Sequence, residues 1–514
     1  MNVTRILGLD VGTSGCKAIV FDRDWHVVAS SHRRYDLTRV GEGGYELDAE
    51  AVWTSVREAV AEARGRAGGS LDAVAVSALG DVIIPLDGSG MPVRPCILDF
   101  DPRGKEEIRD FVAGFGQERL FEITGMPPLH INSLAKILWL RENEPRTYRQ
   151  VRRWATFEDY VLQKLGARPA ASYSMAARTM LFDVRRKTWS AEVLSAAGLA
   201  EHDLPEPVPS AEVISGLDGK AAEELGFSPG AAVCSGGHDM VCAAVGAGLD
   251  ADDRRTALDI MGTMEAVVVL MREPNLGRTM QEHLFPCYPA WNEYISLSLS
   301  LASGSVLDWY RDLFSCLREA GGTGDVYGEL LKGIDSGKPG ELLFMPHFTG
   351  VCNPVFNPDA RGFLYGLSLN TGRRDLAQGV LEGLCYDLKA HVEGFRSAGI
   401  PIERLKIVGG GSSSDAWLQL KANVTGLELA RSDVHEASAM GAAALCGKAV
   451  GVIDNPYRAS GRMGLKETRF VPEPGAVRRF GERFKEYSTL NERISVFEQR
   501  GTQSVERRTE RREP

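Results

Sequence analysis

The sequence predicts an α/β fold made of two related domains around a cleft. The first observation is a pair of short apolar strands joined by a Gly-Thr turn, at residues 6–22. The second is another copy of this strand, turn and strand pattern at residues 257–270. The third is the length of 514 residues, which is too long for one hydrophobic core. We therefore expect an internal duplication, with each copy opening one domain.

The first turn has the residues of a phosphate-binding loop. Gly12 permits a close backbone approach, and Thr13 and Ser14 add hydroxyl donors. Lys17 adds a positive charge from the second strand. Asp10 ends the first strand beside the same space, and a carboxylate next to a triphosphate calls for a divalent cation, so Asp10 is a candidate Mg2+ ligand. Taken alone, this turn fits an ordinary glycine hairpin with a polar tip equally well.

Regular elements follow the first hairpin in an order that fills a sheet. Residues 26–31 continue the meander as a third strand. A helix is predicted at residues 49–67, with Asp48 as its N-cap and the glycines at 68–69 as its stop. Residues 73–77 are predicted to form a buried strand.

Residues 97–103 carry a polar cluster at the predicted end of an apolar run. Loops at strand ends hold ligands in open α/β sheets. Asp101 and Arg103 supply an acceptor and donors of the kind that bind sugar hydroxyls, which makes them candidate substrate ligands. A surface salt bridge is the simpler interpretation of these two residues alone. The following region, residues 134–165, is predicted to be mostly helical.

Residues 233–248 combine an apolar strand, a glycine pair, His238, Asp239 and an alanine-rich helix. A carboxylate in the first turn of a helix is favoured by the helix dipole and stays ionised. A general base that takes a proton from an alcohol needs such a rigidly held carboxylate, so Asp239 is the candidate base. The simpler interpretations are an N-cap for Asp239 and a buried, hydrogen-bonded side chain for His238, which is also a candidate substrate ligand.

The second half of the chain repeats the phosphate-binding pattern. Residues 250–253 form a charged stretch that we interpret as the domain linker. Gly262 and Thr263 then occupy the turn of the second hairpin. Residues 296–307 are predicted to form a strand and a helix, with Ser305 near the junction.

A third glycine-rich loop lies at residues 405–419, between a predicted strand and a predicted helix. Gly410 and Gly411 let the backbone lie flat against a ligand, and Ser414 precedes the helix. The N-terminus of that helix favours negative charge, so a nucleotide fits there. At the end of the chain, residues 500–514 alternate Arg and Glu with few apolar side chains, which predicts a disordered tail.

The overall composition is that of a cytoplasmic enzyme. The formal net charge of −10 argues against nucleic acid as a partner. The chain starts directly in a strand without a signal-like segment, and its apolar runs are too short to span a membrane. Its nine cysteines lack a C-x-x-C pair, which favours reduced thiols over disulfides or a zinc site.

Taken together, the motifs resemble those of the FGGY family of carbohydrate kinases, from about residue 5 to residue 451. The resemblance implies two duplicated domains of the actin, Hsp70 and hexokinase type (ribonuclease H-like), with ATP, Mg2+ and sugar in the cleft between them. It places Asp239 at the position of the catalytic base. The motifs that carry it are Asp10-Val11-Gly12-Thr13-Ser14, Gly236-Gly237-His238-Asp239, Gly262-Thr263, residues 362–367 with Asp375 and Glu382, and Gly409-Gly410-Gly411.

Several positions depart from the xylulokinase-like members of the family. Residues 350–354 lack a Glu-Arg pair, and residues 77–80 differ from a Gln-Met-His loop. Gly379 and Asn423 also differ from the residues usual in the family. His238, together with the Met-Glu pair at 264–265, is closer to fuculokinase-like members. The resemblance therefore implies a small ketose or polyol without specifying which.

The expected organisation follows from these assignments. Residues 1–250 form the domain that binds sugar, through Asp101, Arg103, His238 and Asp239. Residues 251–460 form the domain that binds ATP, and residues 461–514 form a C-terminal helix and the charged tail. Mg2+ is held by Asp10 and Asp239. Two other functions remain open: an ATPase of the actin or Hsp70 type, and a catalytically silent sugar-binding protein. The resemblance also suggests a homodimer.

Overall fold

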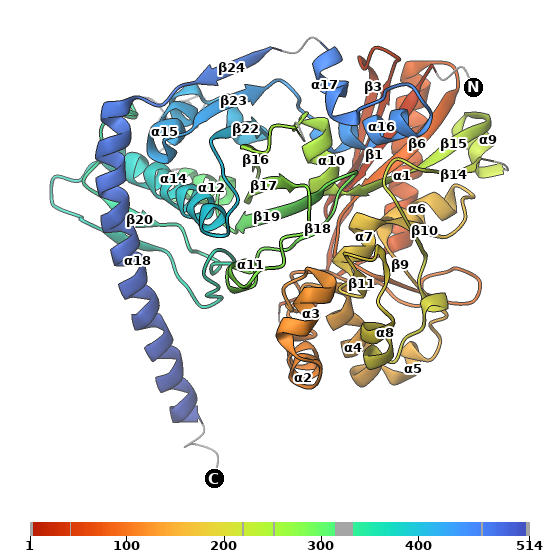
Figure 1. The fold of residues 1–514 in the computed structure, drawn as a ribbon, viewed down its shortest axis with the longest axis horizontal. Coiled ribbons are helices and arrows are strands. Elements are labelled where there is room, and N and C mark those ends of the chain that lie inside the picture. Colours follow the sequence, from red (N-terminus) through yellow and green to blue (C-terminus); the bar gives the residue numbers. More distant parts are fainter. Residues whose placement is uncertain are drawn as a thin grey trace.

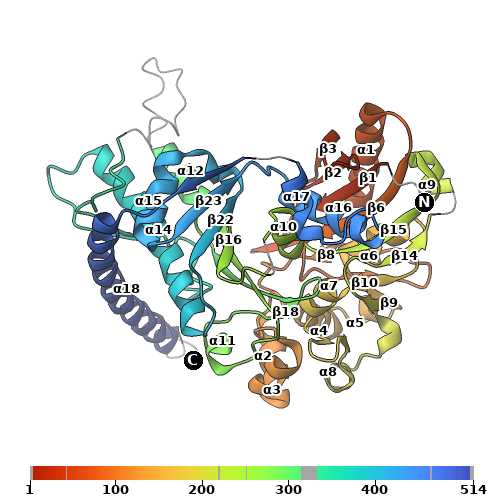
Figure 2. The same ribbon diagram turned by 45° about the horizontal axis from the view of Figure 1, so that its top comes forward.

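The computed structural model describes residues 4–41, 43–217, 220–249, 252–313, 333–463 and 466–509. These residues form two lobes, one built mainly from the first half of the chain and one from the second (Figure 1). Each lobe has a central β-sheet with helices packed against it (Figure 2). The predicted α/β architecture with two domains is therefore confirmed.

The N-terminal lobe is organised around a six-stranded sheet. It contains β1 (Ile6–Val11), β2 (Gly15–Phe21), β3 (Val27–Arg34), β6 (Leu71–Ala78), β14 (Val213–Gly216) and β15 (Phe227–His238). The strand order is β14-β15-β6-β1-β2-β3. β1 forms the predicted hairpin with β2, and β6 pairs in parallel with both β1 and β15. The carboxyl ends of these three strands meet at one edge, where Asp10 lies opposite Ser77 and Ala78 lies opposite His238.

The C-terminal lobe repeats this arrangement in a seven-stranded sheet. It contains β16 (Thr256–Met261), β17 (Glu265–Met271), β18 (Tyr288–Pro289), β19 (Tyr294–Ser300), β22 (Arg404–Val408), β23 (Glu428–Ser432) and β24 (Glu467–Phe470). The order is β18-β19-β17-β16-β22-β23-β24. β16 pairs antiparallel with β17 and parallel with β22, as β1 does with β2 and β6. The inferred duplication is therefore visible in the strand pairing.

The first helix, α1 (Ala49–Ala67), follows the sequence prediction at both ends. The Asp48 carboxylate accepts a 2.8 Å hydrogen bond from the amide of Glu50, and Gly68 ends the helix. The other helices before residue 250 are α2 (Lys105–Phe115), α3 (Gln117–Thr124), α4 (Ser133–Asn143), α5 (Pro145–Tyr148), α6 (Phe157–Lys164), α7 (Tyr173–Arg178), α8 (Ala191–Ala197), α9 (Lys220–Leu225) and α10 (Asp239–Gly246).

Short strands and further helices complete the lobes. The short strands are β4 (Thr38–Val40), β5 (Gly44–Leu47), β7 (Ile84–Leu86), β8 (Cys96–Ile97), β9 (Arg153–Ala155), β10 (Ala170–Ser172), β11 (Phe182–Asp183), β12 (Thr188–Trp189), β13 (Glu206–Val208), β20 (Leu343–Met345) and β21 (Phe363–Tyr365). The later helices are α11 (Arg278–Glu282), α12 (Gly304–Leu313), α14 (Arg373–Ser397), α15 (Asp415–Thr425), α16 (Ala437–Ala449), α17 (Ala459–Arg462) and α18 (Pro474–Thr509), with the short 3-10 turns η3 (Gly410–Ser413) and η4 (Pro456–Arg458).

Helix α16 belongs to the second half of the sequence but packs on the N-terminal sheet (Figure 1). It lies against α10 at glycine contacts: a Cβ atom on Gly441 would be 1.8 Å from the carbonyl oxygen of Cys242. A Cβ atom on Gly246 would be 1.9 Å from the carbonyl oxygen of Ala437. Only glycine permits such an approach of two helices. The expected domain of residues 251–460 is therefore not one spatial unit, because α16 returns to the first lobe.

The chain consequently passes between the lobes three times in the described part. It crosses after α10, again between β23 and α16, and again between α17 and β24. The predicted linker coincides with the first crossing, where Asp252 and Asp253 are described and residues 250–251 lie outside the described residues.

The last helix, α18, lies along the outer side of the C-terminal lobe (Figure 2). The rings of Tyr386 and Tyr487 are 5.2 Å apart, and the Glu498 carboxylate accepts a 3.1 Å hydrogen bond from Asn357. The helix continues to Thr509, so residues 500–509 are helical where composition predicted a disordered tail. Arg and Glu are good helix formers, and they extend a helix that the packed part has already nucleated. Residues 510–514 lie outside the described residues. None of the described helices is long and apolar enough to span a membrane.

Candidate active site

Asp239 lies at a tightly held corner where β15 ends and α10 begins. The buried Glu158 carboxylate accepts a 2.8 Å hydrogen bond from the amide of Gly236, and the amide of His238 donates a 3.0 Å hydrogen bond to Ser174 Oγ. A Cβ atom on Gly236 would be 2.1 Å from the carbonyl oxygen of Val76, so this position requires glycine. The neighbouring strand and these two side chains therefore fix where Asp239 points.

The Asp239 carboxylate combines accessibility with a perturbed charge. Its side chain is 31 % exposed. Burial and the nearby charge of Asp10 raise the pKa of Asp239 to about 7, and the guanidinium of Arg178 acts in the opposite direction. Oδ1 is buried 3.1 Å from His238 Nε2, so the exposed part of the carboxylate lies elsewhere on the group. A pKa near neutrality and a partly exposed carboxylate are the properties of a general base.

The buried ring of His238 lies between Tyr288 and the Asp239 carboxylate. Its side chain is 6 % exposed, and its Nδ1 lies 3.0 Å from the hydroxyl of Tyr288. Burial and the charge of Arg178 lower the pKa of His238 well below its usual value, so the ring is neutral. We assign the proton to Nε2, facing Asp239, with the Tyr288 hydroxyl donating to Nδ1. Both ring nitrogens face protein groups, so the geometry gives His238 a supporting role in place of the predicted substrate contact.

Asp10 and Lys17 meet residues from both halves of the chain. Asp10 Oδ1 accepts a 2.9 Å hydrogen bond from Ser77 Oγ, and burial raises the pKa of Asp10. Lys17 Nζ lies 2.6 Å from Glu436, which directly precedes α16. Sequence reasoning missed Glu436, because no local pattern distinguishes it. Lys17 keeps 36 % of its side chain exposed while it is paired with Glu436.

The pair Asp10 and Asp239 suits a divalent cation. The charge of Asp10 raises the pKa of Asp239, and two carboxylates placed near each other gain from a positive ion between them. Within the described ranges, three or more His, Cys, Asp or Glu side chains nowhere gather into a metal-binding group. Mg2+ commonly uses only one or two carboxylates and takes its other ligands from water and phosphates. The donor set present therefore fits Mg2+ bound together with a nucleotide.

Asp81 and Arg178 form a buried ion pair beside Asp239 that the sequence analysis did not identify. Arg178 Nε donates a 3.1 Å hydrogen bond to Asp81 Oδ2, and Asn132 donates a 3.1 Å hydrogen bond to Oδ1. The charges of both residues act on the pKa of Asp239. Asp81 has a φ of 63°, a left-handed conformation that Asp tolerates better than most residues. The position of Asp81 after a buried strand was the one local feature that could have indicated a site residue. Its partner Arg178 lies 97 positions away, so no local pattern shows the pair.

Further side chains surround this ion pair. The Arg178 guanidinium stacks 5.4 Å from the ring centre of Tyr288, which belongs to the sheet of the other lobe. Burial and the charge of Asp81 raise the pKa of Asp99 to about 6. Burial raises the pKa of the Cys352 thiol to about 11, and the charge of Arg178 acts in the opposite direction. A Cβ atom on Gly80 would be 2.5 Å from the His238 ring, so Gly80 makes room for that side chain. Polar groups of both lobes thus converge beside Asp239.

Asp101 and Arg103 form a structural ion pair, which corrects their predicted role. Asp101 is fully buried, and both of its oxygens are used: Oδ1 accepts from Arg103 Nε at 2.9 Å and Oδ2 from Arg103 Nη2 at 2.7 Å. The amide of Tyr45 donates to Oδ2 at 2.7 Å. The remaining Arg103 nitrogen, Nη1, bonds to Glu46 at 2.8 Å, and the guanidinium stacks on Trp139. The Asp101 carboxylate therefore has no oxygen left for a sugar hydroxyl, and Arg103 is held in place by Asp101 and Glu46.

The predicted nucleotide loops of the second lobe lie together. The amide of Gly304 donates to the carbonyl of Gly262 at 3.1 Å, and the amide of Ser305 donates to that of Thr263 at 3.1 Å. The third loop lies against the end of β16, because a Cβ atom on Gly411 would be 2.9 Å from the Met261 side chain. Ser414 caps α15. Gly262, Thr263 and Gly410 are exposed, so ligand access to these loops is open.

The first phosphate loop has the same open character. Gly12 donates to the carbonyl of Gly15 at 2.9 Å and closes the turn between β1 and β2. The Tyr35 hydroxyl donates to the carbonyl of Gly15 at 2.9 Å and braces the turn from behind. Thr13 is half-buried and Ser14 is exposed. The backbone turn is therefore held in place while its hydroxyl groups stay accessible.

A buried cluster holds the nucleotide loops from below. Lys421 Nζ lies 2.8 Å from Asp259 and 2.5 Å from Glu265, and Lys421 and Asp259 are completely buried. Ser303 Oγ donates a 2.9 Å hydrogen bond to Glu265. Asp259 and Glu265 flank the Gly262 turn, Ser303 precedes α12, and Lys421 lies on α15. One ionic cluster therefore links all three loop elements.

Comparison with known proteins agrees with this arrangement. Residues 5–246 match the N-terminal domain of the FGGY family of carbohydrate kinases, and residues 260–450 match its C-terminal domain. The chain is 28 % identical over 486 residues to a xylulose kinase of Lactococcus lactis, covering 93 % of this chain and 94 % of the relative. It is 24 % identical over 493 residues to a gluconokinase of Bacillus subtilis, covering 94 % of both chains.

A solved structure of a xylulose kinase from Lactobacillus acidophilus superimposes with a TM-score of 0.87 at 22 % identity, covering 96 % of this chain and 99 % of the other. The fold is thus that of two-domain kinases of the actin, Hsp70 and hexokinase type. The chain belongs to the FGGY family of carbohydrate kinases and is an ATP-dependent carbohydrate kinase.

Proposed function

We propose that this enzyme transfers the γ-phosphoryl group of ATP to a hydroxyl of a small ketose or polyol, with Asp239 as the general base. The observation that carries the proposal is the Asp239 corner. Its carboxylate is partly exposed, has a pKa of about 7, and is close enough to Asp10 and to the ion pair of Asp81 with Arg178 for their charges to act on that pKa. Phosphoryl transfer is mainly a matter of positioning and charge stabilisation, which this corner provides.

The sugar is held by the N-terminal lobe around Asp81. Asp81 Oδ1 accepts one hydrogen bond from Asn132 and has a second lone pair for a sugar hydroxyl, the Asp99 carboxylate accepts from hydroxyl groups, and Arg178 donates to hydroxyl or carbonyl oxygens. Tyr288 and the Cys352 loop close the site from the second lobe, which is supported by the stacking of Arg178 on Tyr288 and by the effect of the Arg178 charge on the pKa of Cys352. This placement keeps the predicted assignment of sugar to the first domain, but through a different set of residues from Asp101 and Arg103.

ATP lies between the two sets of glycine loops. Gly12, Thr13, Ser14 and Lys17 approach the phosphates from the first lobe. The second lobe contributes Gly262, Thr263, Ser305, Gly410, Gly411 and Ser414. Asp10 and Asp239 would hold Mg2+, which supplies positive charge to the phosphates during transfer. Closure of the lobes over both substrates excludes water and so protects ATP from hydrolysis.

The relatives named as xylulose kinase and gluconokinase support a small sugar substrate. The departures at residues 77–80 and 350–354 keep the exact sugar open. We further propose that the enzyme acts in the cytoplasm and forms a homodimer.

An ATPase of the actin type would leave the convergence of Asp81, Arg178 and Tyr288 beside Asp239 without a role. A silent sugar-binding protein would not need the phosphate loops of both lobes.

A coupled assay for ADP release over a panel of ketoses, aldoses, polyols and sugar acids tests this function. We expect ADP release that depends on one or a few small ketoses or polyols and on Mg2+. Equal ADP release with and without every sugar would indicate a plain ATPase. Sugar binding by calorimetry without any ADP release would indicate a silent binding protein.

A further inference from the structure

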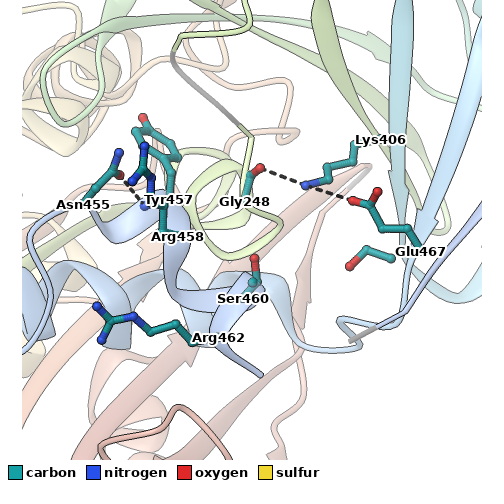
Figure 3. A pocket seen from close by; sticks show the side chains of 10 residues that line it. Gly248, Lys406, Asn455, Tyr457, Arg458, Ser460, Arg462 and Glu467 are labelled. Carbon is teal, nitrogen blue, oxygen red and sulfur yellow. Dashed lines mark hydrogen bonds and ion pairs between the residues drawn. The ribbon is translucent and has the colours of Figure 1, made fainter. Parts of the chain in front are cut away.

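A pocket of about 630 Å3 lies where the chain passes between the lobes (Figure 3). Gly248 just after α10, Lys406 of β22, Ser432 of β23 and Glu467 of β24 line it, together with residues of η4 and α17. In Figure 3, Lys406 and Glu467 lie on one side of Ser460, and Arg458 and Arg462 on the other. The residues that the proposed reaction uses do not line this pocket.

All three crossings of the chain between the lobes border this hinge pocket. Gly248 precedes the first crossing, Ser432 begins the second, and Arg462 and Glu467 flank the third. Hinge motion is absorbed by a few residues at the ends of elements, which are the positions found here. A molecule bound in the hinge pocket therefore contacts the segments that must adjust when the lobes move.

The side chains of the hinge pocket carry excess positive charge. The lining side chains include three cations, Lys406, Arg458 and Arg462, and one carboxylate, that of Glu467. Lys406 Nζ donates to the carbonyl of Gly248 at 2.9 Å and lies 3.4 Å from Glu467. Arg458 and Arg462 are exposed, and in the part of the chain that the structure describes neither guanidinium has an ion-pair partner. Two guanidinium groups are thus free to bind an anion.

The adjoining small pocket provides a contrast. It measures about 150 Å3 and shares Lys406 and Glu467 with the hinge pocket. Its own cations are paired, with Arg404 at 2.6 Å from Asp253 and Arg469 at 3.2 Å from Glu428. The uncompensated charge is therefore confined to the side formed by η4 and α17.

We propose that the hinge pocket binds a small molecule carrying a phosphate dianion, and that the bound anion controls closure of the two lobes. Arginine matches phosphate oxygens with its planar fork, and the hydroxyls of Ser432 and Ser460 add donors. The volume is within the range of small-molecule sites. Inorganic phosphate and phosphorylated sugars, including the product of the reaction, share this chemistry. The control of turnover rests on the proposed function, whereas the binding itself does not.

Calorimetry on the full chain tests the binding. Inorganic phosphate and glucose 6-phosphate are titrated separately, with the nucleotide loops saturated by a non-hydrolysable ATP analogue and Mg2+. The variant Arg458→Ala/Arg462→Ala should bind the preferred probe at least about tenfold more weakly, because charge-assisted hydrogen bonds are lost. The matched control, Arg109→Ala/Arg278→Ala, removes two other exposed arginines and should bind like the wild type. Equal affinity in all three proteins, or no saturable binding by the wild type, would overturn the proposal.

The effect on closure has its own readout. Saturating probe should change the radius of gyration from solution scattering, and the KM for sugar, in the wild type and the control but not in the pocket variant. Unchanged scattering and kinetics with bound probe would refute control of closure while the kinase function stands. If no sugar is phosphorylated at all, the proposed function fails. Calorimetry and scattering would still show whether the hinge pocket binds an anion and whether that anion changes closure of the lobes. The tighter of the two probes indicates free phosphate or a sugar phosphate as the natural ligand.

Discussion

Lys421 Nζ lies 2.8 Å from Asp259, and both side chains are completely inaccessible to solvent. Glu265 lies on the other side of the same ammonium group, so two carboxylates share one buried cation. Burial and the charge of Glu265 raise the pKa of Asp259 above its usual value, and the ammonium of Lys421 acts in the opposite direction. The Gly262 turn, which lies between the two acids, is therefore held from below.

Lys421→Met should destabilise the protein by about 3–5 kcal/mol, since it leaves buried carboxylates without a cation. Glu265→Gln leaves a balanced pair of Lys421 with Asp259 and should change the unfolding free energy much less. Urea unfolding measures both. ATP affinity should fall with Lys421→Met, because the turn loses its support. Equal stability of the two variants would show that the cluster is not ionic.

Asp239→Asn should lower sugar-dependent turnover by about two to four orders of magnitude, the usual contribution of a positioned base. The fold and the affinity for ATP should be retained, because the corner is held by Glu158 and Ser174. Asp24→Asn, at an exposed acid, is the matched control. Turnover of Asp239→Asn within tenfold of the wild type would exclude this residue as the base.

The pH profile follows from the pKa of Asp239, which is about 7. A base must be deprotonated, so kcat/KM for the sugar should fall as the pH drops below about 7. Removing the neighbouring negative charge with Asp10→Asn favours the ionised form of Asp239 and should move the acidic limb to lower pH. Residual activity of that variant is sufficient for the measurement, because only the position of the limb is compared. A limb that stays at the same pH would contradict the coupling of these two acids.

The two phosphate turns should act on one nucleotide. A Cβ atom on Gly12 or on Gly262 would meet its nearest neighbour only at 3.4 Å, so Gly12→Val and Gly262→Val should fold. Each should abolish ATP binding in calorimetry, because the added side chain occupies the space of a phosphate. Gly114→Val, at an open helical position, serves as control. Unchanged affinity in both turn variants would refute a site shared by the two lobes.

Asp81→Asn and Asp101→Asn should separate substrate binding from structure. Asp81→Asn should lower the melting temperature too, because it breaks the buried ion pair with Arg178, but unlike Asp101→Asn it should also raise the KM for sugar far more than the KM for ATP. Asp101→Asn should mainly lower the melting temperature, since this carboxylate is fully buried and bonded to Arg103 and to the amide of Tyr45. A large rise in the KM for sugar at unchanged stability in Asp101→Asn would restore the interpretation drawn from the sequence.

Local patterns in the sequence determined both hairpins, the strand-to-helix corner at Asp239 and the glycine loops, because turn residues and apolar periodicity act over a few positions. The same patterns indicated Asp10 and the duplication. Only the tertiary structure decided which charges face one another. Asp81 meets Arg178 across 97 positions, Lys17 meets Glu436 across 419, and Asp101 is buried against Arg103 instead of facing a ligand. The role of an ionisable side chain depends on its burial and on its nearest charges, and in this protein long-range packing sets both.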